Sequence, residues 1–101
     1  MVWRCNRGCC LLRAVTHRIS AQAELEFPFI GPDTFIGRDV VLKGAEPGDA
    51  VQLAEPWQRP AGVTYFTYVR ETGIVRVCCR NHTVDAVKVP AGTYGVTIEQ
   101  P

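Results

Sequence analysis

Cysteine and histidine are the residue types in this chain best suited to bind a metal ion. The chain has five cysteines and two histidines: Cys5, Cys9, Cys10, Cys78, Cys79, His17 and His82. One Cys79-x-x-His82 spacing is present, but the paired CxxC motifs that characterise zinc sites are missing. Cys78 and Cys79 are neighbours on a predicted strand, so their side chains point to opposite faces and cannot easily share one ion. We therefore predict no metal site, no cofactor and free thiols, which fits assembly in a reducing cytoplasm.

The other reactive residue types form no catalytic arrangement in the sequence. Asn81-His82-Thr83 matches a glycosylation acceptor, but without a convincing secretion signal the expected role of Asn81 is that of a polar turn residue. His82 has no partnered Ser or Cys motif, and the sequence has no HExxH pair, nucleophile elbow or Gly-rich phosphate loop before a helix. Glu24 and Glu26 lie on a face that we expect to be exposed. We predict that the protein is not an enzyme and has no catalytic residues.

A further group of side chains could bind a partner. Residues 63–80 alternate with a period of two on either side of Glu71-Thr72-Gly73, which is short enough for a hairpin with Gly at a left-handed position. This turn pairs Val69 with Val75 and Tyr68 with Arg76. With the valines inward, the outward face holds apolar side chains interleaved with arginines: Phe66, Tyr68, Ile74, Cys78, Arg70, Arg76 and Arg80.

Three interpretations of this outward face remain open from the sequence. Aromatic and arginine side chains on one sheet face suit a protein contact. They could also stack on the bases of single-stranded nucleic acid. Alternatively, the chain's own N-terminal residues could cover the face. We expect a protein contact that includes Phe66, Tyr68, Arg70 and Arg76.

The elements that position these side chains are predicted to be strands throughout residues 23–101. Period-two alternation recurs around residues 24–29, 38–43, 51–53, 63–70, 74–80 and 94–98, and the first of these should be an edge strand because it contains Pro28. Residues 55–62 contain two prolines and are expected to form a crossing loop anchored by Trp57. The pattern predicts an all-β fold, an antiparallel β-sandwich of about six or seven strands. Its expected core is Leu25, Phe27, Val40, Leu42, Val51, Leu53, Tyr65, Val69, Val75, Val77, Tyr94, Val96 and Ile98.

Composition and charge divide the chain into two parts. At 101 residues, with 47% hydrophobic and 21% charged residues, it fits one globular domain, and no apolar run approaches the ~20 residues of a membrane-spanning helix. Residues 1–22 carry four arginines and no acidic residue, whereas residues 23–101 carry seven basic against ten acidic residues, a net charge of −3. We therefore expect a basic N-terminal arm, residues 1–22, and a β-sandwich domain, residues 23–101.

The N-terminal arm is expected to serve attachment more than folding. Ala21-Gln22-Ala23 resembles a signal-peptide cleavage site, but Arg13, His17 and Arg18 interrupt the apolar stretch that a signal peptide needs. An Arg-rich, acid-free start is also typical of a transit peptide or a nucleic-acid-binding arm, yet four arginines make a weak electrostatic footprint. We expect the arm to pack against a neighbouring molecule through its arginines, Arg4, Arg7, Arg13 and Arg18.

Three stretches of the sequence resemble a known structural module. They are FPFIGPDTFIGRDVVLKGAEPGDAVQL, RPAGVTYFTYVRETGIVRVCCRN and VPAGTYGVTI, with a Phe-Pro opening, a Gly-Asp-x-Val turn into a strand, and Pro-Ala-Gly before aromatic strands. Together they resemble a small β-sandwich module of tailed-bacteriophage virion proteins, found in capsid decoration, head-fibre and tail-fibre domains. The resemblance covers residues 24–98 and not the N-terminal arm. Its motifs are core and turn positions, so they concern the fold more than the task.

The resemblance implies a non-enzymatic virion protein. A capsid cement or decoration protein, assembled in the host cytoplasm and bound to the major capsid protein at the capsid surface, is the expected role. The alternative is a host-surface, glycan-binding head-fibre or tail-fibre domain, in which Phe35 and Trp57 stack on a sugar. A domain of this size buries only about 60–65% of its unfolded surface, so we also expect a homo-oligomer, a trimer or a dimer. Nucleic acid is not an expected partner.

Overall fold

The computed structural model describes residues 17–56 and 59–100. These residues form six strands: β1 (His17–Leu25), β2 (Phe35–Val41), β3 (Val51–Ala54), β4 (Val63–Glu71), β5 (Ile74–Asn81) and β6 (Gly92–Gln100). Most of the strands alternate apolar and polar side chains, as strands with one buried face do. The described part of the chain contains no helix of the length and apolar character needed to cross a membrane.

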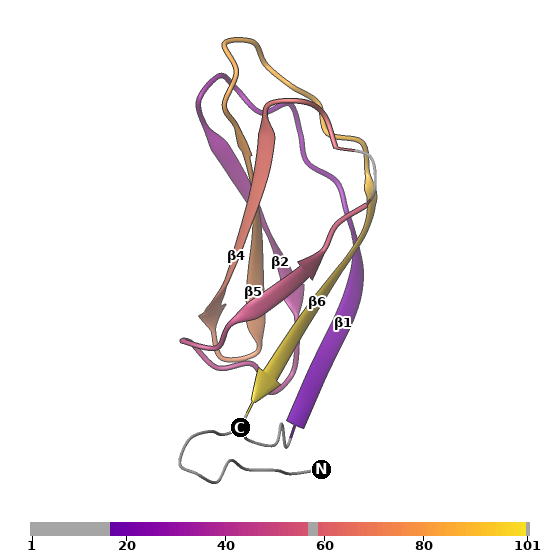
Figure 1. The fold of residues 1–101 in the computed structure, drawn as a ribbon, viewed down its shortest axis with the longest axis vertical. Helices are drawn as coiled ribbons and strands as arrows, with labels where there is room; N and C mark the ends of the chain where they lie inside the picture. Colours follow the sequence, from indigo (N-terminus) through magenta and orange to yellow (C-terminus); the bar gives the residue numbers. More distant parts are fainter. Residues whose placement is uncertain (1–16, 57–58, 101) are drawn as a thin grey trace, which may run out of the picture.

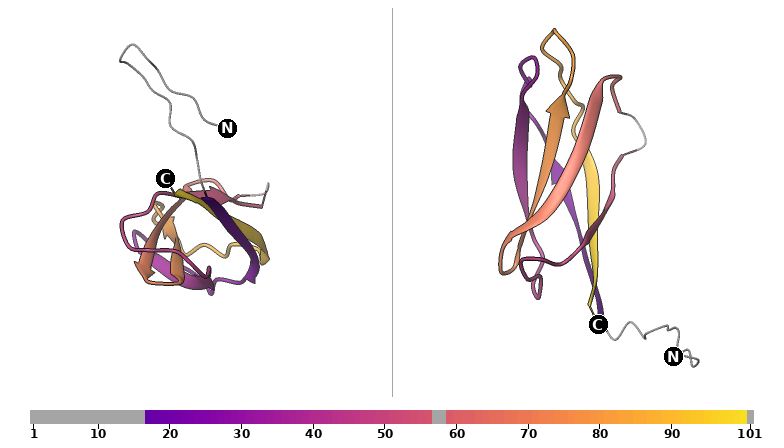
Figure 2. Two further views of the ribbon diagram at one scale, coloured as in Figure 1. Left: turned by 90° about the horizontal axis from the view of Figure 1, so that it is seen from below. Right: turned by 60° about the vertical axis from the view of Figure 1, so that its left-hand side comes forward.

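The strands form two antiparallel sheets of three strands each, so the all-β prediction is confirmed. One sheet has the order β1-β6-β3 and the other the order β2-β5-β4. The two sheets form two layers, with β2, β5 and β4 on the left of Figure 1 and β6 and β1 on the right, and the view along the molecule in Figure 2 shows the same arrangement. Both the arrangement and the strand number, which is six in the described residues, agree with a sandwich-like fold.

The core lies between the two sheets and contains every residue predicted for it. Ten of these residues are buried, and Val51, Leu53 and Tyr65 pack against them while partly exposed. Hydrogen-bonded tyrosine hydroxyls, Tyr65 Oη and Tyr94 Oη at 2.8 Å, link β4 of one sheet to β6 of the other. The ring of Phe27 meets Tyr94 edge to face, with centroids 5.9 Å apart. The core also includes residues absent from the prediction: Ile30, Ala45, Val63, Cys79 and Val89.

The first strand differs from the prediction. β1 begins at His17 and ends at Leu25, so the expected strand at 24–29 is wrong, and the expected arm boundary after residue 22 falls inside β1. The inward positions Ile19, Ala21 and Ala23 give a weak apolar signal because two of them are alanines. The chain leaves the strand before Pro28, and the exposed Phe29 lies in the loop beyond it. β1 is an edge strand, but Pro28, on which the prediction of an edge strand rested, lies beyond it.

The β4–β5 hairpin agrees with the sequence prediction. Val69 lies opposite Val75 and Tyr68 opposite Arg76. Gly73 has a backbone φ of +82 in the turn, a conformation that residues other than glycine rarely adopt. One register shift occurs between Val69 and Glu71, which marks a bulge near the end of β4. The hairpin therefore places the predicted outward residues on one face of the β2-β5-β4 sheet.

Asn81, at the end of β5, connects the loops at one end of the molecule. Its side chain is fully buried, and Nδ2 donates to the carbonyl oxygens of Ile30, Gly31 and Asp85 at 3.0, 3.2 and 2.8 Å. Its Oδ1 accepts from the backbone N and the hydroxyl of Thr83 at 2.8 and 2.7 Å. The side chain expected to be an ordinary polar turn residue thus satisfies the backbone of two loops, residues 26–34 and 82–91.

Replacing Asn81 should therefore cost more than replacing its neighbours. Asn81→Ala would remove all five hydrogen bonds of a fully buried side chain and leave a gap between the two loops, and we expect a loss of about 3 kcal/mol in the free energy of unfolding. Urea denaturation followed by circular dichroism measures this. His82→Ala is the matched control, because His82 is exposed and its ring shares one hydrogen bond with Thr64. Equal midpoints for the two variants would contradict this role of Asn81.

Candidate partner-binding face

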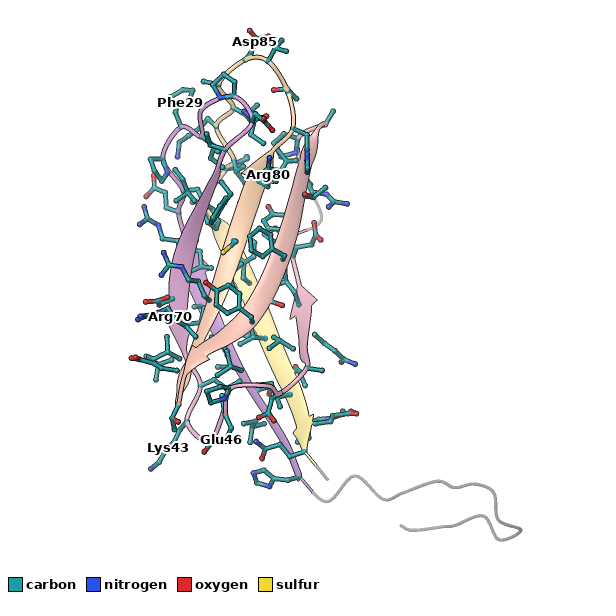
Figure 3. All side chains as sticks on the ribbon, turned by 90° about the vertical axis from the view of Figure 1, so that its left-hand side faces the viewer. Phe29, Lys43, Glu46, Arg70, Arg80 and Asp85 are labelled. Carbon is teal, nitrogen blue, oxygen red and sulfur yellow. The ribbon has the colours of Figure 1, made fainter. Side chains whose placement is uncertain are left out.

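The outer face of the β2-β5-β4 sheet collects the side chains that the sequence analysis selected. Here it is called the aromatic–arginine face, defined by Phe35, Phe66, Tyr68, Arg70, Arg76 and Arg80. Its residues stand in cross-strand rows: Phe35 lies opposite Arg80, and Arg76 lies opposite both Asp39 and Tyr68. Figure 3 shows this face toward the viewer, with Arg70 and Arg80 at opposite ends of it.

The aromatic side chains of the face are unusually exposed. Phe35 is 51% exposed, Phe66 41% and Tyr68 44%. Phe35 and Phe66 contact each other edge to face, with ring centroids 5.4 Å apart. Such a pair is held in place without being covered, which lowers the entropy that binding would otherwise cost. The face therefore presents a pre-formed apolar surface.

Gly37 makes room for the guanidinium of Arg76. A Cβ at this position would overlap Arg76 Nε, so a larger residue would force the guanidinium to shift from its place across β2. There Arg76 Nη1 donates to Asp39 Oδ1 at 2.8 Å, and Nη2 contacts the Gly37 carbonyl oxygen at 3.4 Å. Arg76 is consequently fixed against the sheet and does not extend into solvent.

Carboxylates of the same chain neutralise the arginines of the face. Asp39 accepts from Arg70 at 3.0 Å as well as from Arg76, and Asp33 accepts from Arg80 at 2.7 Å. Desolvation raises the pKa of Asp39, but the hydrogen bonds and charges of Arg70 and Arg76 outweigh it and hold that pKa below the ordinary 3.8. Glu71 lies 3.9 Å from Arg70. The charges of three arginines are therefore balanced by those of three carboxylates. The face is polar at its edges and close to neutral.

The two cysteines of β5 lie on opposite sides of the sheet, as predicted. Cys78 stands between Gly37 and Phe66 on the outer side, and Cys79 stands between Ile36 and Tyr65 on the core side. Both thiols are free and buried, and burial raises the pKa of Cys79 to about 11. Among the described residues, no group of three His, Cys, Asp or Glu side chains could hold a metal ion. His82 contacts the Thr64 hydroxyl at 2.8 Å instead of a cysteine.

The structure brings together only part of the predicted site. Phe66, Tyr68, Arg70 and Arg76 share the aromatic–arginine face, as expected. Arg18 lies in the other sheet, on β1, and pairs with Glu99 of β6. Arg4, Arg7 and Arg13 lie outside the described residues.

Sequence reasoning missed the contribution of β2 to this face. It places Phe35 in a loop, where the ring could stack on a sugar with Trp57, but Phe35 lies on β2 and packs on Phe66. Trp57 falls outside the described residues. Extending the observed alternation of Asp39 and Val41 back by two steps would have placed Phe35 on the outer face.

No protein-family model, curated protein or solved structure matches this chain. Its function is therefore inferred from the residues of the aromatic–arginine face and from the sequence resemblance of residues 24–98.

The lowered pKa of Asp39 predicts a pH-dependent contribution to stability. A carboxyl group with a depressed folded-state pKa stabilises the fold above its unfolded value, here 3.8, and loses this effect as the pH falls through the folded-state value. Asp39→Asn should therefore lower the free energy of unfolding at pH 7, by at most about 1 kcal/mol because the group is partly exposed. The difference from the parent chain should shrink below pH 3.8. A difference that is constant with pH would contradict the ion-pair assignment; thermal unfolding from pH 2 to 7 measures it.

The contact between Gly37 and Arg76 predicts a non-additive pair of substitutions. Gly37→Ala alone should destabilise the fold by up to about 1 kcal/mol, since the new methyl group displaces the guanidinium from its partly exposed ion pair with Asp39. In an Arg76→Ala background the same change should cost clearly less, because the obstructing side chain is gone. A double-mutant cycle by urea denaturation measures the coupling, and additive effects would show that Arg76 does not depend on Gly37.

Proposed function

We propose that this chain is a non-enzymatic structural protein of a tailed-phage virion, a capsid cement or decoration protein. In this proposal it binds the lattice of the major capsid protein through the aromatic–arginine face and stabilises the head. The supporting observation is the exposure of Phe35, Phe66 and Tyr68 side by side on a rigid sheet. The resemblance of residues 24–98 to phage virion modules supplies the class of partner.

The composition of the face suits a protein partner. Interface cores are enriched in aromatic residues and arginine, and a few such residues carry most of the binding energy. Here the arginines are already hydrogen-bonded to Asp39 and Asp33, so burying them does not leave an unpaired charge. The exposed aromatic rings can then gain apolar contact area at small electrostatic cost.

The same ion pairs argue against nucleic acid as the partner. Phosphate binding needs cations that are free to replace counterions. Arg70, Arg76 and Arg80 each hold a carboxylate of this chain, and residues 23–101 carry a net charge of −3. Binding a phosphate would require these pairs to separate, or a phosphate to approach neighbouring carboxylates.

Repetition of a capsid lattice would compensate for a small contact. Each aromatic–arginine face offers only a modest apolar area, which suits a weak individual interaction. A homo-oligomer placed on several identical capsid subunits binds with an avidity well above the affinity of one face. The proposed oligomer and the proposed lattice partner thus support each other.

Substitution of exposed aromatic residues tests the proposal. Phe66→Ala and Tyr68→Ala should each weaken attachment to capsids by about 1–3 kcal/mol, since they truncate the centre of the apolar surface. Phe29→Ala is the matched control, because Phe29 is 67% exposed but lies on a loop at the end of the molecule (Figure 3). Sedimentation of capsids stripped of this chain, mixed with purified variants, measures binding, and urea denaturation confirms that each variant folds.

The salt dependence of binding separates the two kinds of partner. Attachment to capsids through apolar contacts should change little with salt, whereas binding to single-stranded DNA should fall steeply. Purified protein that retards single-stranded DNA at physiological salt but does not bind stripped capsids would overturn the proposal. Equal effects of Phe29→Ala and Phe66→Ala on capsid binding would reject the aromatic–arginine face as the contact.

A further inference from the structure

Among the described residues the two sheets have four edge strands, and three of them carry features that discourage pairing with another chain. β3 has only four residues. β4 has a bulge between Val69 and Glu71. β2 carries Arg38 on its inner side opposite Val77, and its Nε donates to the Glu26 carbonyl oxygen at 2.9 Å. Short edges, bulges and inward-pointing charges are devices that limit edge-to-edge association.

β1 has none of these features. It pairs with β6 without a register shift over all nine residues, and it contains neither proline nor an inward-pointing charge. Its inward side chains Ile19, Ala21 and Ala23 remain only half-buried. Figure 1 shows β1 along the border of its sheet, with β6 on one side. No strand within residues 17–56 and 59–100 pairs with the outer edge of β1, which therefore offers a long run of backbone donors and acceptors.

We propose that β1 is a strand-addition edge whose partner is β1 of a second copy of this chain. The two strands run antiparallel about a two-fold axis at Ala21, and they join two β1-β6-β3 sheets into one continuous sheet. The pairing gives hydrogen-bond partners to the outer backbone groups of β1. It also covers Ile19, Ala21 and Ala23 with the same residues of the second copy.

The charge pattern of β1 selects this register. With Ala21 opposite Ala21, all nine residues overlap, and Arg18 of each copy stands opposite Glu24 of the other. Opposite charges directly across an antiparallel pair are favourable. Sliding the strands by two residues puts Gln22 opposite Arg18 in one direction and Ser20 opposite Glu24 in the other. Either shift shortens the overlap and removes both Arg18–Glu24 pairs.

The groups concerned are available in the single chain. Glu24 makes no ion pair with any described residue, and its one hydrogen bond is a long contact of 3.4 Å from the Thr93 hydroxyl. Arg18 pairs with Glu99 on the β6 side. A guanidinium has five N–H donors, so Arg18 can also donate to a carboxylate on its other side.

This proposal is independent of the capsid proposal. β1 belongs to one sheet and the aromatic–arginine face to the other, so association through β1 leaves that face free. The dimer should exist in purified protein, without capsids or other components. Failure of capsid binding would leave the dimer intact, and failure of dimerisation would leave the contact of each single face with the capsid in place, without the avidity of a dimer.

Complementary charge reversal on the full chain tests the proposal by sedimentation equilibrium. The parent chain should form dimers. Glu24→Lys and Arg18→Glu each place like charges opposite each other twice, so each variant alone should raise the dimer dissociation constant by about tenfold or more. An equimolar mixture of the two variants should recover the dimer. The Glu24→Lys copy carries basic residues at positions 18 and 24, and the Arg18→Glu copy carries acidic residues at both positions, so opposite charges face each other again. Recovery on mixing also shows that neither variant has merely failed to fold.

A cross-link tests the register directly. Directly opposed residues of an antiparallel pair have Cα atoms about 4.5–5.5 Å apart, a separation that a disulfide spans. In a chain with Cys5, Cys9 and Cys10 replaced by serine, Ala21→Cys should form a disulfide-linked dimer on oxidation. Ala23→Cys is the control, because residue 23 faces residue 19 of the second copy and should link much less.

The matched charge control is Asp85→Lys. Asp85 is exposed on a loop remote from β1, and its substitution changes the net charge as Glu24→Lys does (Figure 3). It should leave the dimer unaffected. The proposal would be overturned by a parent chain that stays monomeric, by a dimer that Glu24→Lys does not weaken, or by variants that do not associate when mixed. A dimer that is lost only when residues 1–16 are removed would also overturn it, since residues 1–16 and not β1 would then make the contact between the copies.

Discussion

The buried carboxamide of Asn81 ties together two of the segments that connect the two sheets. The chain crosses between the sheets four times, and two of these crossings, residues 26–34 and 82–91, lie at the same end of the molecule (Figure 1). Loops of this kind have backbone groups that no ladder satisfies, and burying them unpaired is costly. Asn81 donates to carbonyl groups of both loops and also accepts from Thr83. One side chain at the end of β5 therefore holds two loops that connect the sheets in a fixed position relative to each other.

The position of β5 explains why the partner-binding face is rigid. As the central strand it fixes the register of β2 on one side and β4 on the other, so Phe35 and Phe66 meet across it. At the other end of the molecule the hairpin turn is bonded to the preceding turn, since Gly73 N donates to the Ala45 carbonyl oxygen at 2.9 Å. Because β5 is held at both ends, the register of β2 and β4 relative to β5 is fixed. Its aromatic and charged side chains thus keep their spacing before any partner arrives.

Most of this fold could be predicted from the sequence, because the alternation of apolar residues and the residues of the turns are local features of the chain. Alternation identified the inward residues of five strands, and Gly73 identified the hairpin, so Val69 and Val75 could be paired correctly. β1 was misplaced because alanines carry little apolar signal, and the stronger phenylalanines after it lie beyond the strand. Phe35 was missed for a different reason. Its role depends on β2 lying beside β5, and the neighbour of a strand in a sheet is a property of the whole chain that alternation does not encode.

Asn81 also occupies the first position of an Asn-x-Thr acceptor sequence, and this has a consequence for how the protein can be made. An oligosaccharide attached to Nδ2 would replace an amide hydrogen and require space where the side chain is fully enclosed. Glycosylation and folding therefore compete for the same nitrogen atom, Asn81 Nδ2. A chain that folds first is protected, whereas a chain modified first cannot close its loops. Production in bacteria avoids this competition, and entry into a eukaryotic secretory pathway would expose the nascent chain to it.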